Sequence, residues 1–204
     1  MTPRRIACEA VPGHPAFVRL GSVEGIAIDL RYASTNNVFG RDVYAGLDCA
    51  WLHADAAAAL AQAVAWLHAH APAERLCVLD ALRPHRVQQR LWAELHDPTL
   101  RRYLASPEQG SIHSYGLAVD ATLLGADGRE LDMGSGFDAM SERSHPEFES
   151  RLLAEGALTT AQVAARERLR GAMAAGGFQG VGHEWWHFDI HDRAATRARG
   201  LRVE

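Results

Sequence analysis

Apolar side chains recur three and four residues apart in several stretches of the chain, which is the spacing of an amphipathic helix. The clearest stretch covers residues 53–71, where Leu60, Val64 and Leu67 fall on one face. Pro72 follows directly, and proline cannot continue a helix because it lacks a backbone N–H. We therefore predict a helix over residues 53–71 that packs against the core.

Two further helices are predicted, the first from the same spacing and the second from its end signals. One covers residues 85–96 and follows Pro84, a residue that is favourable in a first helical turn. The other runs to Ala175 and opens with Thr159 and Gln162, whose spacing matches a capping box. Two glycines after Ala175 supply a C-terminal stop for this helix.

Short apolar or alternating runs predict the strands of a sheet. These runs cover residues 25–32, 76–80, 117–124, 129–132 and 185–190. Three segments are predicted to lack regular structure: residues 1–24, the long loop 133–150 and the C-terminal tail 191–204. No linker or repeat divides the chain, so we expect one α+β domain over residues 1–204, with a central antiparallel sheet flanked by helices.

Charge and basic-residue usage narrow the possible partners. The 204 residues carry a formal charge of −4 without a long basic run, which argues against a nucleic-acid partner. All 21 Lys and Arg positions are arginine, so mechanisms that depend on a lysine are excluded. The arginines after residue 190 are interpreted as a solvated tail rather than a binding patch: Arg193, Arg197, Arg199 and Arg202.

The cysteine spacing and the length of the apolar runs predict in which cellular compartment the protein lies. Cys8, Cys49 and Cys77 are scattered without metal-binding spacing, so we expect reduced structural thiols. No apolar run is long enough to span a membrane, and no signal-peptide core follows Arg4 and Arg5. We therefore expect a cytoplasmic protein with no membrane partner, and the sequence leaves its oligomeric state open.

Residues 182–189 place a carboxylate close to a histidine, as a metal-dependent hydrolase requires. Glu184 lies three positions before His187, with two tryptophans between them. The stretch 183–187 also matches HExxH literally, but that motif needs a helix so that both histidines share one face. Preceding glycines and the aromatic run favour a strand instead, so we interpret this as a site carried by a strand.

A second stretch, residues 111–120, supplies further candidate ligands. Asp120 lies within an otherwise apolar strand, where a buried acid needs a partner or a metal. His113 precedes it by seven residues, which would put the two side chains on opposite faces of a straight strand. A turn at Gly116 can bring His113 back toward Asp120. Composition alone does not identify either His113 or His187 as a ligand, because the chain contains 11 histidines and most must be structural.

Five motifs in order then resemble a known family. The pair SIHSYGLAVD (111–120) and EWWH (184–187) resembles the zinc D,D-peptidases, which include D-alanyl-D-alanine carboxypeptidases and the N-terminal Hedgehog domain. Three further stretches narrow the resemblance to VanX-type D-alanyl-D-alanine dipeptidases: RYASTNNVFG (31–40), DALRP (80–84), and MGSGFD (133–138) followed by ERSH (142–145). The resemblance covers residues 25–190 and implies a fold of the Hedgehog and D,D-peptidase type.

The resemblance implies a role for each matching residue. Its metal ligands would be His113, Asp120 and His187, holding one Zn²⁺ per chain. Glu184 would act as general base and acid, and Arg83 would stabilise the oxyanion. The substrate-binding positions would be Tyr32 and Asp138 at the amino end, Ser111 near the carboxylate, and Asp80 as a supporting acid. His145 and His183 are interpreted as structural.

The implied activity is zinc-dependent hydrolysis of D-alanyl-D-alanine to two D-alanines, with a small dipeptide as the partner. Two alternatives remain open at this point. One is a related carboxypeptidase or endopeptidase acting on cell-wall peptides, which would need an open groove. The other is a binding module that keeps the metal fold without catalysis, although the presence of Glu184 and Arg83 argues against it.

Overall fold

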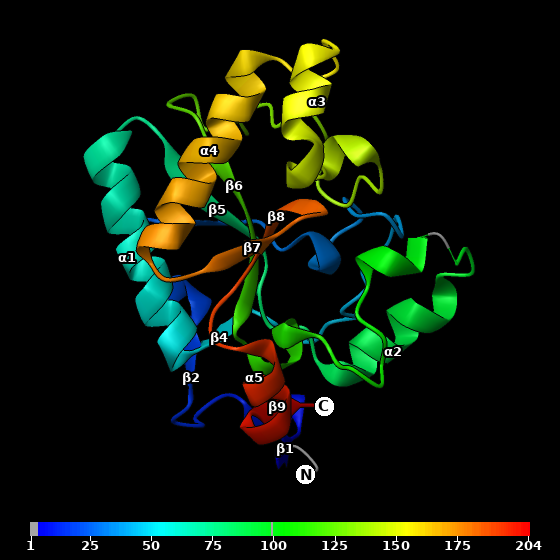
Figure 1. The fold of residues 1–204 in the computed structure, drawn as a ribbon. Coiled ribbons are helices and arrows are strands. Elements are labelled where there is room, and N and C mark those ends of the chain that lie inside the picture. The colour runs from blue at the N-terminus through cyan, green and yellow to red at the C-terminus, as the bar shows by residue number, and fades with distance from the viewer. Residues whose placement is uncertain (1–3, 99) are drawn as a thin grey trace.

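The computed structural model of the chain describes residues 4–98 and 100–204. It has the mixed helix and sheet composition that was predicted (Figure 1). The strands are β1 (Arg4–Ile6), β2 (Phe17–Arg19), β3 (Ala27–Ile28), β4 (Trp51–His53), β5 (Arg75–Asp80), β6 (Ala118–Leu124), β7 (Gln179–Val181), β8 (Glu184–Asp189) and β9 (Leu201–Val203). The α-helices are α1 (Ala54–His70), α2 (His85–Glu94), α3 (Glu149–Ala154), α4 (Thr160–Ala175) and α5 (Arg193–Arg199).

The central sheet has five strands in the order β3-β5-β6-β8-β7. The pairs β5–β6, β6–β8 and β7–β8 are antiparallel, but the edge strand β3 runs parallel to β5. The prediction of an antiparallel sheet is therefore wrong at this edge. The strand predicted over residues 25–32 is also reduced to two residues, because the chain turns into a 3-10 helix at Arg31–Ala33.

Helices α1 and α4 pack against each other and cover one face of the sheet (Figure 1). Alternation along β6 places Val119, Ala121 and Leu123 in the same apolar core as these helices. The capping box at Thr159 and Gln162 is present, which confirms the predicted start of α4. At the other end of α4, a Cβ atom on Gly176 would lie 2.2 Å from a backbone oxygen of α1, so this close approach requires glycine.

The two terminal segments are more ordered than predicted. β1 and β9 form a parallel pair, which brings both ends of the described chain together (Figure 1). The interpretation of the C-terminal arginines as a solvated tail is wrong for three of the four: Arg202 is buried, and Arg193 and Arg197 are half-buried. By contrast, the predicted strand at 129–132 is reduced to a single bridge between Leu124 and Glu130.

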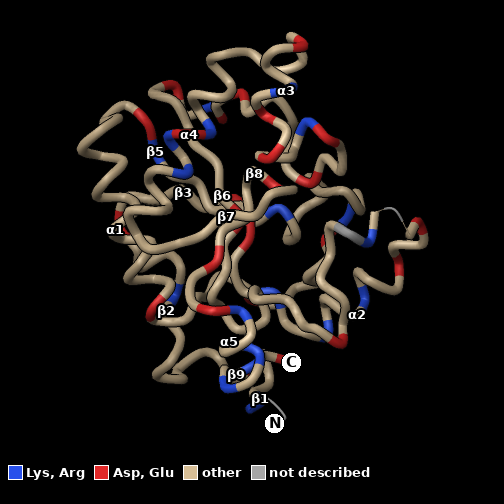
Figure 2. Tube along the Cα trace, viewed as in Figure 1, with Lys and Arg blue, Asp and Glu red and all other residues tan. Residues whose placement is uncertain are grey.

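Acidic and basic positions are interspersed along most of the trace, whereas basic positions gather near α5, β9 and β1 (Figure 2). The three cysteines are buried and carry free thiols. Among the described residues, no helix combines the length and the apolar character needed to cross a membrane.

Candidate metal centre and catalytic cavity

Three polar side chains lie in a row across the middle of the sheet. Strand register pairs Asp120 with Asp80 on one side and with His187 on the other. Asp80 reaches this row only because the pairing of β5 with β6 shifts between Val78 and Asp80. Without that irregularity, alternation would turn Asp80 toward the helices with Val78. The sheet therefore presents acids and a histidine on the face that α1 and α4 leave open.

His113 joins this row from the turn that precedes β6. A 3-10 helix (Ile112–Tyr115) ends at Gly116, which has the left-handed backbone angles φ 65° and ψ 22°. A Cβ at Gly116 would also lie 2.7 Å from the backbone nitrogen of His53, so both conformation and space favour glycine. The turn proposed from the sequence is therefore present, and it returns His113 to the side of Asp120.

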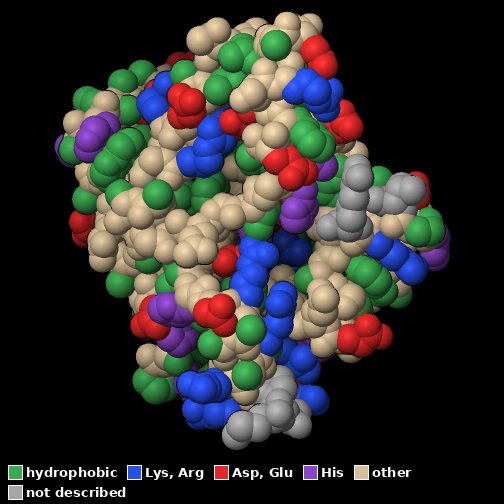
Figure 3. Space-filling view, in the orientation of Figure 1, with side chains coloured by type: hydrophobic (Ala, Val, Ile, Leu, Met, Phe, Trp, Pro, Cys, Tyr) green, Lys and Arg blue, Asp and Glu red, His purple; other side chains and the backbone are tan. Residues whose placement is uncertain are grey.

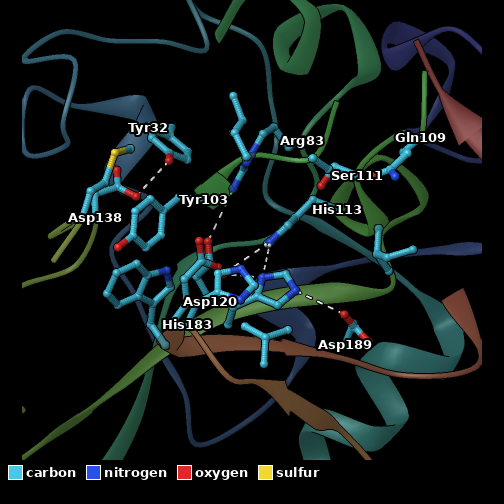
Figure 4. A pocket seen from close by; sticks show the side chains of 18 of the residues that line it. Tyr32, Arg83, Tyr103, Gln109, Ser111, His113, Asp120, Asp138, His183 and Asp189 are labelled. Atoms are coloured by element: carbon cyan, nitrogen blue, oxygen red, sulfur yellow. Dashed lines mark hydrogen bonds and ion pairs between the residues drawn. The ribbon is translucent and has the colours of Figure 1, made fainter. Parts of the chain in front are cut away.

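His113, Asp120 and His187 form a trio whose facing atoms make a compact triangle (Figure 4). Nε2 of His113 lies 3.2 Å from Nδ1 of His187 and 3.3 Å from Oδ1 of Asp120. Nδ1 of His187 lies 3.0 Å from the same carboxylate oxygen. A tetrahedral zinc site with ligand distances near 2.0–2.1 Å has ligand–ligand separations of about 3.3–3.4 Å, so the triangle has suitable dimensions.

The outer nitrogens of both histidines explain why a cation fits between them. Nδ1 of His113 lies 2.8 Å from the carbonyl oxygen of Ala81, which can only accept a hydrogen bond. Nε2 of His187 lies 3.2 Å from Oδ2 of Asp189, again an acceptor. In the neutral rings, the nitrogens that face Asp120 are therefore unprotonated, so two lone pairs and a carboxylate converge on one point. Such a donor set fits a divalent metal ion with an open coordination position.

The pKa shifts of Asp120 and His187 likewise indicate that this trio favours a positive charge at its centre. Burial by itself would raise the pKa of Asp120, but the neighbouring His113 and His187 hold it well below its ordinary value. Burial opposes protonation of His187, but its hydrogen bonds to Asp120 and Asp189 outweigh this effect and raise its pKa to about 10. The carboxylates therefore stabilise a positive charge at the centre of the trio.

Arg83 is held beside the trio by a buried network. Its guanidinium donates to Asp80 from Nε (2.9 Å) and Nη2 (2.7 Å), and Nη2 also lies 3.4 Å from Asp120. Nη1 donates to Gln88 over 3.2 Å. The hydroxyl of Tyr44 donates to the other oxygen of Asp80. Asp80 has no exposed surface and does not line the cavity, so it acts on Arg83 and not on a ligand directly.

Tyr32 and Asp138 form a second polar group at one end of the cavity. The Tyr32 hydroxyl donates to Asp138 over 3.0 Å, and the Arg83 guanidinium lies over the Tyr32 ring at 4.8 Å. Asp138 has a left-handed backbone with φ 59°, which aspartate tolerates better than most residues. Burial, and then the negative charge of Asp120, raise the pKa of Asp138 to about 7.

Glu184 and His187 line the same cavity although they are an odd number of residues apart on β8. The pairing of β7 with β8 shifts between Gly180 and Val181, and this irregularity breaks the strict alternation of side chains. Burial raises the pKa of Glu184 to about 8. Since residues 184–189 form a strand and His183 lies outside the trio, the rejection of a helical HExxH site is confirmed.

These groups surround a cavity of about 230 Å³. It is lined by eight of the nine predicted site residues, all except Asp80: Tyr32, Arg83, Ser111, His113, Asp120, Asp138, Glu184 and His187. Figure 4 shows Tyr32 and Asp138 on one side of the central trio, and Ser111 and Gln109 on the other. The cavity therefore has an acidic end, a middle formed by the two histidines and the aspartate that could hold a metal ion, and a polar far end.

Several residues that support this site were not predicted from the sequence. Asp189 orients His187, and its position two residues further along the same strand is a signal that was available. At the cavity wall, the Tyr103 hydroxyl lies 2.8 Å from Nε2 of His145, whose Nδ1 lies 3.3 Å from Glu147. His145 is thus structural, as predicted, but it holds a residue that lines the cavity.

Known proteins are similar to this chain in sequence over most of its length. A family model described as D-ala-D-ala dipeptidase matches residues 16–200. The chain is 38% identical over 170 residues to the D-alanyl-D-alanine dipeptidase of Escherichia coli (strain K12), covering 83% of this chain and 81% of that protein. It is 33% identical over 189 residues to the D-alanyl-D-alanine dipeptidase of Enterococcus faecalis (strain ATCC 700802 / V583), covering 83% and 88%. A same-named protein of Enterococcus faecium is 41% identical over 91 residues, 44% of this chain and 40% of the relative. With its buried histidine and aspartate trio, the chain belongs to the metal-dependent D-alanyl-D-alanine dipeptidase family.

Proposed function

We propose that this protein hydrolyses D-alanyl-D-alanine to two molecules of D-alanine, with one zinc ion held by His113, Asp120 and His187. The convergence of two imidazole lone pairs and a carboxylate within 3.3 Å of one another carries the proposal. When bound, zinc would supply Lewis-acid chemistry, making a water molecule more acidic and polarising the peptide carbonyl.

Glu184 is proposed to move the protons of the reaction. A base works best when its pKa lies near the working pH, and burial raises the pKa of Glu184 to about 8. The carboxylate would take a proton from the attacking water and later donate it to the leaving amine. A positive charge at the trio would favour the ionised form of Glu184 and so prepare it for the first of these transfers.

Arg83 is proposed to stabilise the negative charge that develops on the carbonyl oxygen. Its guanidinium has five N–H groups. Four of them are directed at Asp80, Asp120 and Gln88, which leaves one on Nη1 for the oxyanion. The network around Asp80 fixes the guanidinium before substrate arrives, so little reorganisation is needed in the transition state.

The two ends of the cavity would read the two ends of a free dipeptide. Asp138, held by Tyr32, is proposed to bind the substrate ammonium, and Ser111 to lie near its carboxylate. Cavities for drug-sized ligands hold about 300–1,000 Å³, so the smaller volume here suits a dipeptide better than a long cell-wall peptide. We place the reaction in the cytoplasm, because D-alanyl-D-alanine is made there.

The proposal is tested with a panel of substrates and a metal chelator. We expect the zinc-loaded protein to release D-alanine from D-alanyl-D-alanine, and to act poorly on L-alanyl-L-alanine and on a muramyl pentapeptide. Chelation should abolish turnover, and added Zn²⁺ should restore it. A preference for the pentapeptide would favour a carboxypeptidase instead, and a zinc-loaded protein inert to every D,D-dipeptide would overturn the proposed function.

A further inference from the structure

Two arginines of α5 lie in the wall of the catalytic cavity, which the sequence analysis did not predict. Arg193 and Arg197 are four residues apart on this helix and both line the cavity. Figure 3 shows basic side chains gathered over α5 and beside the hollow above it. This end of the chain therefore contributes positive charge to the site.

Among the cavity arginines, Arg197 differs in how its charge is used. Arg83 pairs with Asp80 and Asp120, and the Arg193 side chain pairs with Asp189. Arg197 is half-buried, and none of the ion pairs found among the described residues includes it. Within the described part of the chain, its one hydrogen bond to protein runs from Nε to the carbonyl oxygen of Gly110 over 3.1 Å. The four N–H groups on its two terminal nitrogens remain for a ligand.

The bond to Gly110 also fixes where that charge lies. Gly110 directly precedes Ser111, so the guanidinium is tethered to the end of the cavity that contains Ser111. Figure 4 shows Ser111 and Asp138 on opposite sides of the metal-binding trio. The cavity thus has an anionic group at one end and a cation without a carboxylate partner at the other. This polarity matches a zwitterionic dipeptide lying across the trio.

We propose that Arg197 binds the free carboxylate of the substrate and so selects dipeptides with an unblocked C-terminus. A guanidinium is suited to this task because it presents paired N–H groups to a carboxylate. The inference rests on the proposed function, since it specifies the substrate contacts of the same site. It assigns to Arg197 the ionic part of a recognition in which Ser111 supplies the neutral part.

The test compares D-alanyl-D-alanine with its C-terminal amide, which lacks the carboxylate charge. Wild-type protein should prefer the acid. In Arg197→Gln, kcat/KM for the acid should fall by about 10- to 100-fold, mainly through KM, as expected for loss of a charged hydrogen bond. The value for the amide should change little, so the preference should disappear. Arg197→Lys should recover part of it, because the charge is retained.

Arg199→Gln is the matched control, because Arg199 is exposed on the same helix and does not line the cavity. It should keep the wild-type preference. Binding gives an independent readout: in a Glu184→Gln background, calorimetry should show that Arg197→Gln weakens binding of the acid and leaves binding of the amide unchanged.

The possible failures can be told apart. If Arg197→Gln lowers activity on the acid and the amide equally, Arg197 merely positions the loop at Gly110, and the inference is wrong. An unchanged preference in an active protein would overturn the inference alone. A zinc-loaded wild type that hydrolyses no D,D-dipeptide would overturn the proposed function and this inference with it.

Discussion

Asp189 allows the metal centre to be tested without measuring hydrolysis. It is 3% exposed, and its Oδ2 lies 3.2 Å from Nε2 of His187. This contact keeps the proton on Nε2 and leaves Nδ1 free to face Asp120. Asp189→Asn preserves the shape of the side chain but removes the charge, and its amide can present a donor instead of an acceptor. His187 would then lose the group that fixes its tautomer.

Removal of such a supporting carboxylate typically lowers metal affinity by about 10- to 100-fold. This corresponds to about 1.4–2.8 kcal/mol of binding free energy. We expect a change of this size in the zinc dissociation constant of Asp189→Asn, measured by competition with a chromophoric chelator at neutral pH. Circular dichroism and thermal unfolding of the metal-free proteins would establish that the variant is folded.

Arg193→Gln provides the control for this measurement. Arg193 donates to the same carboxylate from Nε over 2.8 Å, so the variant disturbs Asp189 but keeps its contact with His187. Its zinc affinity should change much less. The reasoning is refuted if folded Asp189→Asn binds zinc as tightly as wild type, or if Arg193→Gln weakens zinc binding to the same degree.

Three further predictions follow from the site and the helix packing. Glu184→Gln cannot accept a proton, so it should bind zinc normally while kcat for D-alanyl-D-alanine falls by about 10²- to 10⁴-fold; kcat within a factor of a few of wild type would remove Glu184 from its role. Burial raises the pKa of Asp138 to about 7, so the carboxylate is lost as the pH falls through that value. The wild-type KM should therefore rise below about pH 7, whereas Asp138→Asn should have a high KM that does not vary over this range; a parallel rise in both proteins would exclude Asp138 as the ammonium site. Gly176→Ala would place a Cβ 2.2 Å from the backbone oxygen of Ala59 and should lower the free energy of unfolding by about 3 kcal/mol or more, measured with urea. Gly136→Ala, where the added Cβ meets nothing within 4 Å, should change it by less than about 1 kcal/mol; equal effects of the two substitutions would contradict the packing argument.

The helices and the metal ligands were the parts most open to prediction. The helix predicted over residues 53–71 is observed at Ala54–His70, and the one that opens with Thr159 is observed at Thr160–Ala175. Helix signals are local, because capping and apolar spacing involve residues within one or two turns. His113, Asp120 and His187 were proposed as ligands from the resemblance, and the structure brings them together.

Strand pairing was less predictable, because a strand depends on partners that are distant in the sequence. The run at 25–32 alternates, yet only Ala27–Ile28 pairs with β5, and the pairing is parallel. The register shift that turns Asp80 toward the cavity has no local signal, since an extra residue in one strand is defined only by the strand opposite.

The sequence by itself determined helices α1, α2 and α4 and the absence of any lysine from the chemistry, and its resemblance to a known family indicated which residues would hold a metal. These properties reside in side-chain type and in short spacings. Only the tertiary structure decided that Tyr44 and Asp80 hold Arg83, that Asp189 orients His187, and that Arg197 reaches the cavity. Each of these depends on which surfaces face each other after folding. The buried core and the strand order, rather than any one segment, set that arrangement.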